Sequence, residues 1–181
     1  KEHLLRPANP EWIDEAGILL VRECLSNSFN QKIVLQQLME QGFKHDTIVD
    51  YCIPLAATKL GESWVNDTLS FSEATVGSAN LQILLKLIAE NREIGFESSN
   101  GKRFLICVHE SEQHTLGALV MGDMLRRQGH SLKIKLDAKL SEICNLQESN
   151  DYDAIFFSCG SYLSVRETAS CVNKIRKTFR Y

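Results

Sequence analysis

The chain has 181 residues, of which 44% are hydrophobic and 24% are charged, and its formal net charge at pH 7 is -3. This length fits one large domain or two small ones, and the composition is typical of a globular protein with a real core. Acidic and basic residues are mixed along the chain, so the clustered basic face of a nucleic-acid-binding protein is not expected. No apolar run approaches the roughly 18 residues of a membrane-spanning helix. Direct contact with nucleic acid and a place in a membrane are therefore not expected.

The cysteines show no disulfide or zinc pattern. Six are present, without a C-x-x-C pair, and several lie within apolar stretches, as buried thiols do. The start, KEHLLRPANPEW, is charged and lacks the apolar segment of a signal peptide. We therefore predict a reducing, cytoplasmic setting. The first residue is Lys rather than Met, so the chain is expected to be a fragment of a longer protein.

The first half, from residue 9 to about 95, has the periodicity of helices. Asn9 is a candidate N-cap, and Pro10 occupies the first helical position after it. A second helix is predicted over 31–42, ending at Gly42. Its expected buried side consists of Ile33, Leu35, Leu38 and Met39.

Two further helices complete this half. The stretch 45–64 contains Pro54, which is expected to kink the helix or delay its start. The stretch 70–92 opens with Ser70 and Glu73 at the spacing of a capping box. Four helices with short links predict a small bundle.

The second half alternates short strands with helices. Strands are predicted over 102–108, 131–136 and 152–157, and helices over 115–129, 139–146 and 164–179. Ser164 and Glu167 have the spacing of another capping box. Strands that alternate with helices indicate β-α-β units and a parallel sheet.

The expected fold class is α/β, with two domains. Residues 1–96 form the four-helix bundle, and residues 102–181 form a flavodoxin-like (Rossmann-like) parallel-sheet domain, with ESSNG (97–101) as the linker. Three strands make half of a doubly wound sheet, so this domain is expected to be incomplete at its C-terminus.

The candidate site lies in the loops that follow the first and third strands. Ligands of open parallel sheets bind at the carboxyl ends of the strands, and these two loops are neighbours if the strand order is 2-1-3. His114 stands at the start of a helix, and Glu112 is a plausible acceptor for one ring nitrogen. Gly117 allows close approach, either of the helix to the sheet or of a flat ligand to the helix. Taken alone, His114 and His109 also fit solvated loop histidines.

The stretch Glu112-Gln-His114-Thr-Leu-Gly117 resembles the D-x-H-x-x-G signature of cobalamin-binding domains, with Glu in place of Asp. The resemblance implies that His114 is the lower axial ligand of cobalt, in place of the dimethylbenzimidazole base. Glu112 would then hydrogen-bond His114, and Ser158 would hydrogen-bond the buried base. The cofactor-binding residues implied in this way are Glu112, His114, Thr115, Gly117, Ser158, Ser161 and Trp64. Cys159 and Ser161 also fit a simple turn.

The stretch 60–82, LGESWVNDTLSFSEATVGSANLQ, resembles the helical cap of methionine-synthase-type cobalamin modules. In that family the cap covers the upper face of the corrin, and an aromatic residue near the position of Trp64 packs over it. The alternative for Trp64 is a place in the helical core. Phe71 is a core candidate in either case.

Within this group, EQHTLGALVMGDMLRRQG and the cap look most like the AerR/PpaA antirepressors of photosynthesis genes and the related SCHIC domain of the AppA photoreceptor. These proteins bind cobalamin, or in some accounts haem, and act on a repressor of the PpsR/CrtJ type. The resemblance therefore implies a regulatory module that is not an enzyme. Two alternatives remain: a corrinoid carrier of a methyltransferase system, and a haem-binding sensor or interaction domain.

The chain departs from the cobalamin-binding pattern at two places. Glu112 is one methylene longer than Asp, so its bond to His114 is expected to be looser or mediated by water. The Gly-Gly segment that lines the nucleotide tail in the family is absent before Tyr181, so an incomplete tail pocket is expected. The upper cobalt ligand, any response to light, the identity of the partner and the oligomeric state are not specified by the sequence.

Overall fold

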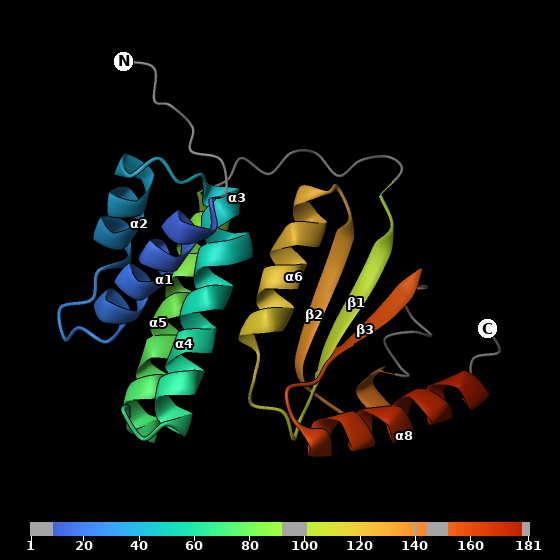
Figure 1. Cartoon of the computed structure of the whole chain (residues 1–181). Coiled ribbons are helices and arrows are strands. Elements are labelled where there is room, and N and C mark those ends of the chain that lie inside the picture. The colour runs from blue at the N-terminus through green and yellow to red at the C-terminus, as the bar shows by residue number, and fades with distance from the viewer. Residues whose placement is uncertain (1–8, 92–100, 140, 144–151, 179–181) are drawn as a thin grey trace. The chain divides into compact units, whose positions relative to one another are not determined.

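A computed structural model of the chain describes residues 9–91, 101–139, 141–143 and 152–178. The chain divides into two compact units, Lys1–Glu93 and Ile94–Tyr181. The described part of the first unit is helical, and that of the second contains a parallel sheet with helices (Figure 1). The α/β fold class is confirmed. No helix among the described residues is both long and apolar enough to cross a membrane.

The first two helices begin where their caps predict. Helix α1 spans Pro10–Cys24, and the side chain of Asn9 accepts the backbone N–H of Glu11 at 3.0 Å. Helix α2 spans Gln31–Glu40, and the chain leaves it through Gly42, whose φ of 91° favours glycine. The predicted buried side of α2 is only partly right. Leu35 and Leu38 are buried and so is Val34, whereas Ile33 and Met39 are exposed.

Pro54 reshapes the next helix. A short helix α3 (His45–Thr47) runs into a π-helical turn η1 (Ile48–Cys52), and regular α-helix resumes as α4 (Ile53–Val65). Proline has no N–H, and its ring crowds the carbonyl four residues earlier. The wider π turn, in which the N–H of Ile53 reaches Ile48 O, relieves that crowding without ending the helix.

Helix α5 (Phe71–Glu90) completes the helical unit. Its capping box is present, with Ser70 Oγ accepting the Glu73 N–H and Glu73 Oε2 accepting the Ser70 N–H at 2.8 Å. The helix buries an apolar stripe against its neighbours, and each such buried side chain contributes about 2 kcal/mol. The stripe consists of Leu81, Leu84, Leu85 and Ile88.

The second unit is built on a parallel three-stranded sheet of order β2-β1-β3, the order in which the loops after β1 and β3 are neighbours. The strands are β1 (Arg103–His109), β2 (Ser131–Ala138) and β3 (Ala154–Ser158). The central strand β1 is a nearly continuous apolar run, RFLICVH, because both of its faces are covered.

Helices α6 (Leu116–Arg127) and α8 (Tyr162–Thr178) cover opposite faces of this sheet (Figure 1). Residues of β1 alternate between the two sides. Phe104, Ile106 and Val108 pack with Ala118 and Leu125 of α6. Leu105 and Cys107 pack with Cys171 and Ile175 of α8. This two-sided packing gives the unit its flavodoxin-like character.

One sequence prediction is wrong, and two others fall largely outside the described residues. The capping box at Ser164 is wrong, because α8 begins two residues earlier, at Tyr162, and its first turn is closed by the bond from Val165 N to Ser161 O. The helix predicted over 139–146 is described as helical only at 141–143, and its later residues lie outside the described part. The predicted linker 97–101 also lies outside it, except for Gly101.

Candidate functional site

The site is built from two loops at the carboxyl edge of the sheet. The loop between β1 and α6 carries Glu112 and His114, and the loop between β3 and α8 carries Gly160. These loops are neighbours because β1 and β3 pair directly, with Val108 opposite Ser158 at the end of the ladder. Parallel pairing therefore brings together residues that are almost fifty positions apart in the chain.

Glu112 is buried, with 3% of the residue exposed, although glutamate is rarely buried unless it is paired. Its Oε1 accepts the backbone N–H of His114 at 2.8 Å and lies 2.5 Å from the ring Nδ1 of the same residue. Its Oε2 accepts the backbone N–H of Gly160 at 2.5 Å. One carboxylate thus joins both loops. The contact with Nδ1 is direct, so the expected looser or water-mediated bond is wrong.

His114 has a fixed ring nitrogen and an exposed ring. An ionised carboxylate can only accept hydrogen bonds, so the geometry assigns the ring proton to Nδ1. Nε2 of the neutral ring then keeps its lone pair, and no hydrogen bond reaches it from the residues that the structure describes. The side chain is 71% exposed. A neutral imidazole with one nitrogen held by a carboxylate is the arrangement found in metal-binding histidines.

Gly160 lies against the imidazole of His114. A Cβ atom at position 160 would be 2.8 Å from Nδ1 and 2.9 Å from Cγ of that ring. Gly117 differs, because a Cβ there would meet nothing within 4 Å. Close packing of α6 on the sheet is therefore not the reason for Gly117. Its predicted role in admitting a flat ligand stays a prediction.

The other predicted residues of this unit lie around the same edge. Thr115 precedes α6, and its side chain makes no capping bond. Ser158 is the last residue of β3, and the carbonyl of Ser161 accepts the first helical N–H of α8, from Val165. Cys159 lies 3.2 Å from Thr168 Oγ1, so its thiol faces α8. The structure brings Glu112 and His114 together, and it places Thr115, Ser158 and Ser161 in the two loops or at their ends.

Sequence reasoning missed a second polar cluster between the same two segments. The hydroxyl of Ser111 donates to Glu167, and His109 Nδ1 lies 2.9 Å from Ser111 Oγ and 3.3 Å from Glu167 Oε2. The imidazole of His109 and the hydroxyl of Ser111 thus contact each other and one carboxylate of α8. The spacing in the sequence predicts a local capping box for Glu167, and no spacing links it to Ser111.

Trp64 belongs to the helical unit and is 45% exposed, so it is not a core residue. Its ring meets that of Phe71 edge-on, with the centroids 5.9 Å apart and the planes at 63°. Phe71 is 68% exposed, and the expectation that it is buried is wrong. The two rings form an exposed aromatic pair, from the end of α4 and the start of α5.

Cysteine ligation of a metal is not supported in either core. Burial raises the pKa of the Cys24, Cys52 and Cys107 thiols to about 12, so these thiols stay protonated at neutral pH. Among the described residues, no group of three or more histidine, cysteine, aspartate or glutamate side chains has the arrangement of a metal site. A single axial imidazole needs no such group.

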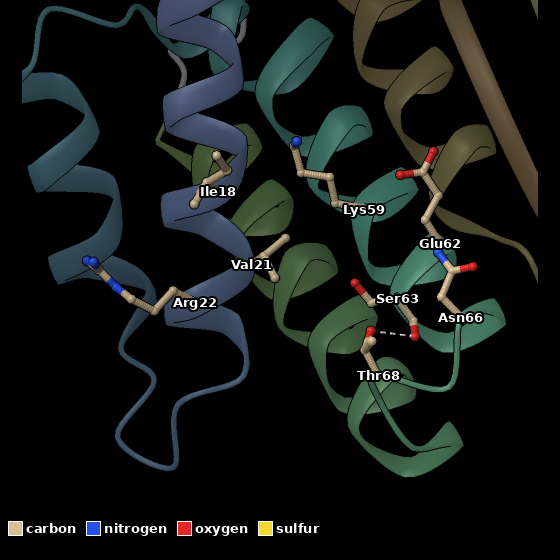
Figure 2. A pocket seen from close by; sticks show the side chains of 8 residues that line it. All are labelled: Ile18, Val21, Arg22, Lys59, Glu62, Ser63, Asn66 and Thr68. Atoms are coloured by element: carbon tan, nitrogen blue, oxygen red, sulfur yellow. Dashed lines mark hydrogen bonds between the residues drawn. The ribbon is translucent and has the colours of Figure 1, made fainter.

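A cavity of about 460 Å³ lies on the helical unit, beside α1 and α4 (Figure 2). Lys59 at its wall pairs with Asp14 at 2.8 Å. Thr68 donates its hydroxyl to the Ser63 carbonyl at 2.8 Å, as the dashed line in Figure 2 shows. Lys59 and Thr68 therefore have partners within the helical unit. The lining of the cavity contains no imidazole and no thiol.

The chain is similar in sequence to a curated bacterial protein. No protein-family profile matches the chain. A curated protein of Rhodobacter capsulatus, described as an uncharacterized 20.5 kDa protein in the bchF-crtJ intergenic region, is 32% identical over 133 residues. The match covers 72% of this chain and 68% of the relative. The chain therefore belongs to the family of this Rhodobacter capsulatus protein from the bchF-crtJ intergenic region.

Proposed function

We propose that the chain is a cobalamin-binding regulatory module in which His114 is an axial ligand of cobalt. The observation that carries this proposal is the contact between the buried Glu112 carboxylate and Nδ1 of His114, at 2.5 Å. It holds an exposed ring whose Nε2 can bind a metal when the imidazole is neutral. Coordination by neutral imidazole needs a nitrogen of this kind, and its partner carboxylate raises the basicity of the ligand.

The contacts of Glu112 fit a ligand of this class. Glu112 is satisfied by N–H groups from both loops, so the ring is held before any ligand arrives. Trp64, in the helical unit, is an exposed aromatic residue, as the resemblance implies for the residue that packs over a corrin. When bound, cobalamin would supply a cobalt centre whose chemical state or response to light can change. His114 would hold the cobalt, and Glu112 would hold His114.

The proposed output is contact with a repressor of the PpsR/CrtJ type. The relative is encoded in the bchF-crtJ intergenic region, which supports a functional connection with the neighbouring crtJ gene. A partner responds to the ligand only if its affinity differs between the liganded and free states. Two polar contacts connect the His114 loop with the α8 side of the unit, from Glu112 to Gly160 and from Ser111 to Glu167. Movement of His114 on ligation would be passed to α8 through them.

The test is an absorption titration of the full chain with hydroxocobalamin and, separately, with hemin. We expect hydroxocobalamin to bind with a histidine-ligated spectrum, and His114→Ala to lower its affinity by about 100-fold or more. His45→Ala, in the helical unit, is the matched control and should bind as the wild type does.

Equal binding by the wild type and His114→Ala would contradict the ligand assignment. Spectral change with hemin alone would favour the haem-binding alternative. If cobalamin binds, transfer of methyl from methylcobalamin-loaded protein to homocysteine would favour the carrier alternative over a regulator.

A further inference from the structure

Gly160 makes a hydrogen bond across the two loops of the site. It lies between the end of β3 at Ser158 and the start of α8 at Tyr162, and its N–H donates to Glu112 Oε2 at 2.5 Å. The two partners are 48 positions apart in the chain. Because Glu112 holds His114 through its other oxygen, the Gly160 amide fixes the carboxylate that fixes the ring.

Gly160 also leaves space that no other residue would leave. A Cβ at this position would lie 2.8, 2.9 and 3.0 Å from Nδ1, Cγ and Cβ of His114. Real Cβ atoms do not approach other heavy atoms below about 3 Å, because repulsion rises steeply there. The crowded atoms are the base of the imidazole and its attachment point. A side chain at position 160 would therefore push the whole ring away from Glu112.

The backbone conformation does not account for this glycine. Among the described glycines, only Gly42 and Gly129 have positive φ. Gly160 thus has a backbone conformation that other residues adopt, and its lack of a side chain matters for space alone. The reason for glycine at this position is the imidazole that lies against it.

Gly122 shows what an ordinary packing glycine looks like in the same unit. A Cβ there would meet Ile134 Cδ1 at 2.7 Å and Leu132 Cδ2 at 3.0 Å. Both atoms are ends of flexible side chains on β2, which can rotate away. A substitution at Gly122 therefore strains the contact between α6 and the sheet without touching Glu112 or His114.

We propose that Gly160 is a positioning residue for the axial imidazole. Its N–H holds the Glu112 carboxylate, and its missing side chain leaves the room in which the His114 ring rests. This proposal rests on the proposed function, because it assigns Gly160 a part in presenting Nε2 to cobalt. A ring confined on two sides loses less freedom when it binds, and the ligand gains affinity from that preorganisation.

The experiment compares Gly160→Ala with Gly122→Ala in the full chain. Nitrogen NMR of the ligand-free protein reports the tautomer of the His114 ring, and an absorption titration reports affinity for hydroxocobalamin. We expect the wild type and Gly122→Ala to hold the proton on Nδ1. Gly160→Ala should lose that fixed tautomer and bind hydroxocobalamin about 10-fold more weakly.

Two results would overturn the proposal. One is an unchanged His114 tautomer in Gly160→Ala, and the other is an equal loss of affinity in both variants, which would show a general packing effect. If the tautomer changes only in Gly160→Ala but the wild type binds no cobalamin, the positioning role stands and the proposed function fails.

A measurement on the unsubstituted glycine covers the case in which Gly160→Ala does not fold. Hydrogen exchange of the Gly160 amide should be slow in the wild type and faster in Glu112→Ala, because the acceptor has gone. Equal exchange rates in the two proteins would contradict the bond on which the proposal depends.

Discussion

The two units present their candidate ligand-binding residues in opposite ways. In the sheet unit, His114 is held by a buried carboxylate that also takes an N–H from the neighbouring loop. In the helical unit, the rings of Trp64 and Phe71 meet edge-on, and both residues are exposed. A ring nitrogen held in one position suits metal coordination, because coordination bonds are directional. An exposed aromatic pair suits apolar contact over a wider surface of a ligand. The difference predicts large effects from changes around His114 and small ones around Trp64.

The largest effect after loss of His114 itself is expected for Glu112→Gln. Glutamine offers one oxygen in place of two, and its amide nitrogen would face another donor, either the Gly160 N–H or the His114 ring. We expect a loss of about 1–3 kcal/mol in the free energy of unfolding and of about 10–100-fold in cobalamin affinity. Chemical denaturation and an absorption titration measure the two quantities.

Glu110→Gln is the control for that change. Glu110 is in the same loop, but its carboxylate is half exposed and lies 3.8 Å from Lys139. Exposed pairs of this kind contribute little to stability. If both variants behaved alike, burial of Glu112 would not be the source of its effect.

A smaller effect is expected for Trp64→Ala. The side chain is 45% exposed, so its loss should change the stability of the helical unit little. Aromatic contacts of this kind contribute about 0.5–1.5 kcal/mol, so cobalamin affinity should fall about 2–12-fold. The spectrum of the histidine-ligated cofactor should stay unchanged.

Val65→Ala, at a neighbouring exposed position, is the control. A changed axial-ligand spectrum in Trp64→Ala would contradict the division of roles between the units.

The smallest effect on binding is expected for Ser70→Ala, which removes the capping box of α5. The unfolding temperature of the helical unit should fall by several degrees, with no change in the His114 ring signals. Ser72→Ala is the control, in the exposed first turn.

The hydroxyl and N–H of Ser70 hold the pKa of Glu73 below its ordinary value. This part of the stabilisation is therefore complete above that ordinary pKa and is lost in acid, where the difference between the two proteins should become smaller. A difference that does not change with pH would contradict this cause.

Local signals in the sequence predicted much of the fold. Asn9 and the pair of Ser70 and Glu73 specify helix starts through contacts within three residues, and the structure has both. Strands alternating with helices predicted the parallel sheet, whereas its strand order comes from the structure. Periodicity did less well for burial, since it shows which residues share a face but not what that face meets. Ile33 and Phe71 are exposed for this reason.

The site was predictable only in part. Glu112 and His114 are two residues apart, so their contact follows from a local pattern. The bond from Gly160 to Glu112 and that from Ser111 to Glu167 join residues 48 and 56 positions apart. Such contacts arise from the way that β1 and β3 pair, which brings the loops together. A loop glycine in the sequence gives no sign that a distant imidazole lies against it.

The most direct test of the account is electron paramagnetic resonance of the cob(II)alamin complex, prepared with protein carrying ¹⁵N-labelled histidine. The nuclear spin of the axial nitrogen splits the cobalt signal, and ¹⁵N gives doublets where ¹⁴N gives triplets. We expect doublets with labelled protein, because the axial nitrogen belongs to His114. Triplets that are insensitive to the label would show that the cofactor keeps its own base, and would contradict His114 as the ligand.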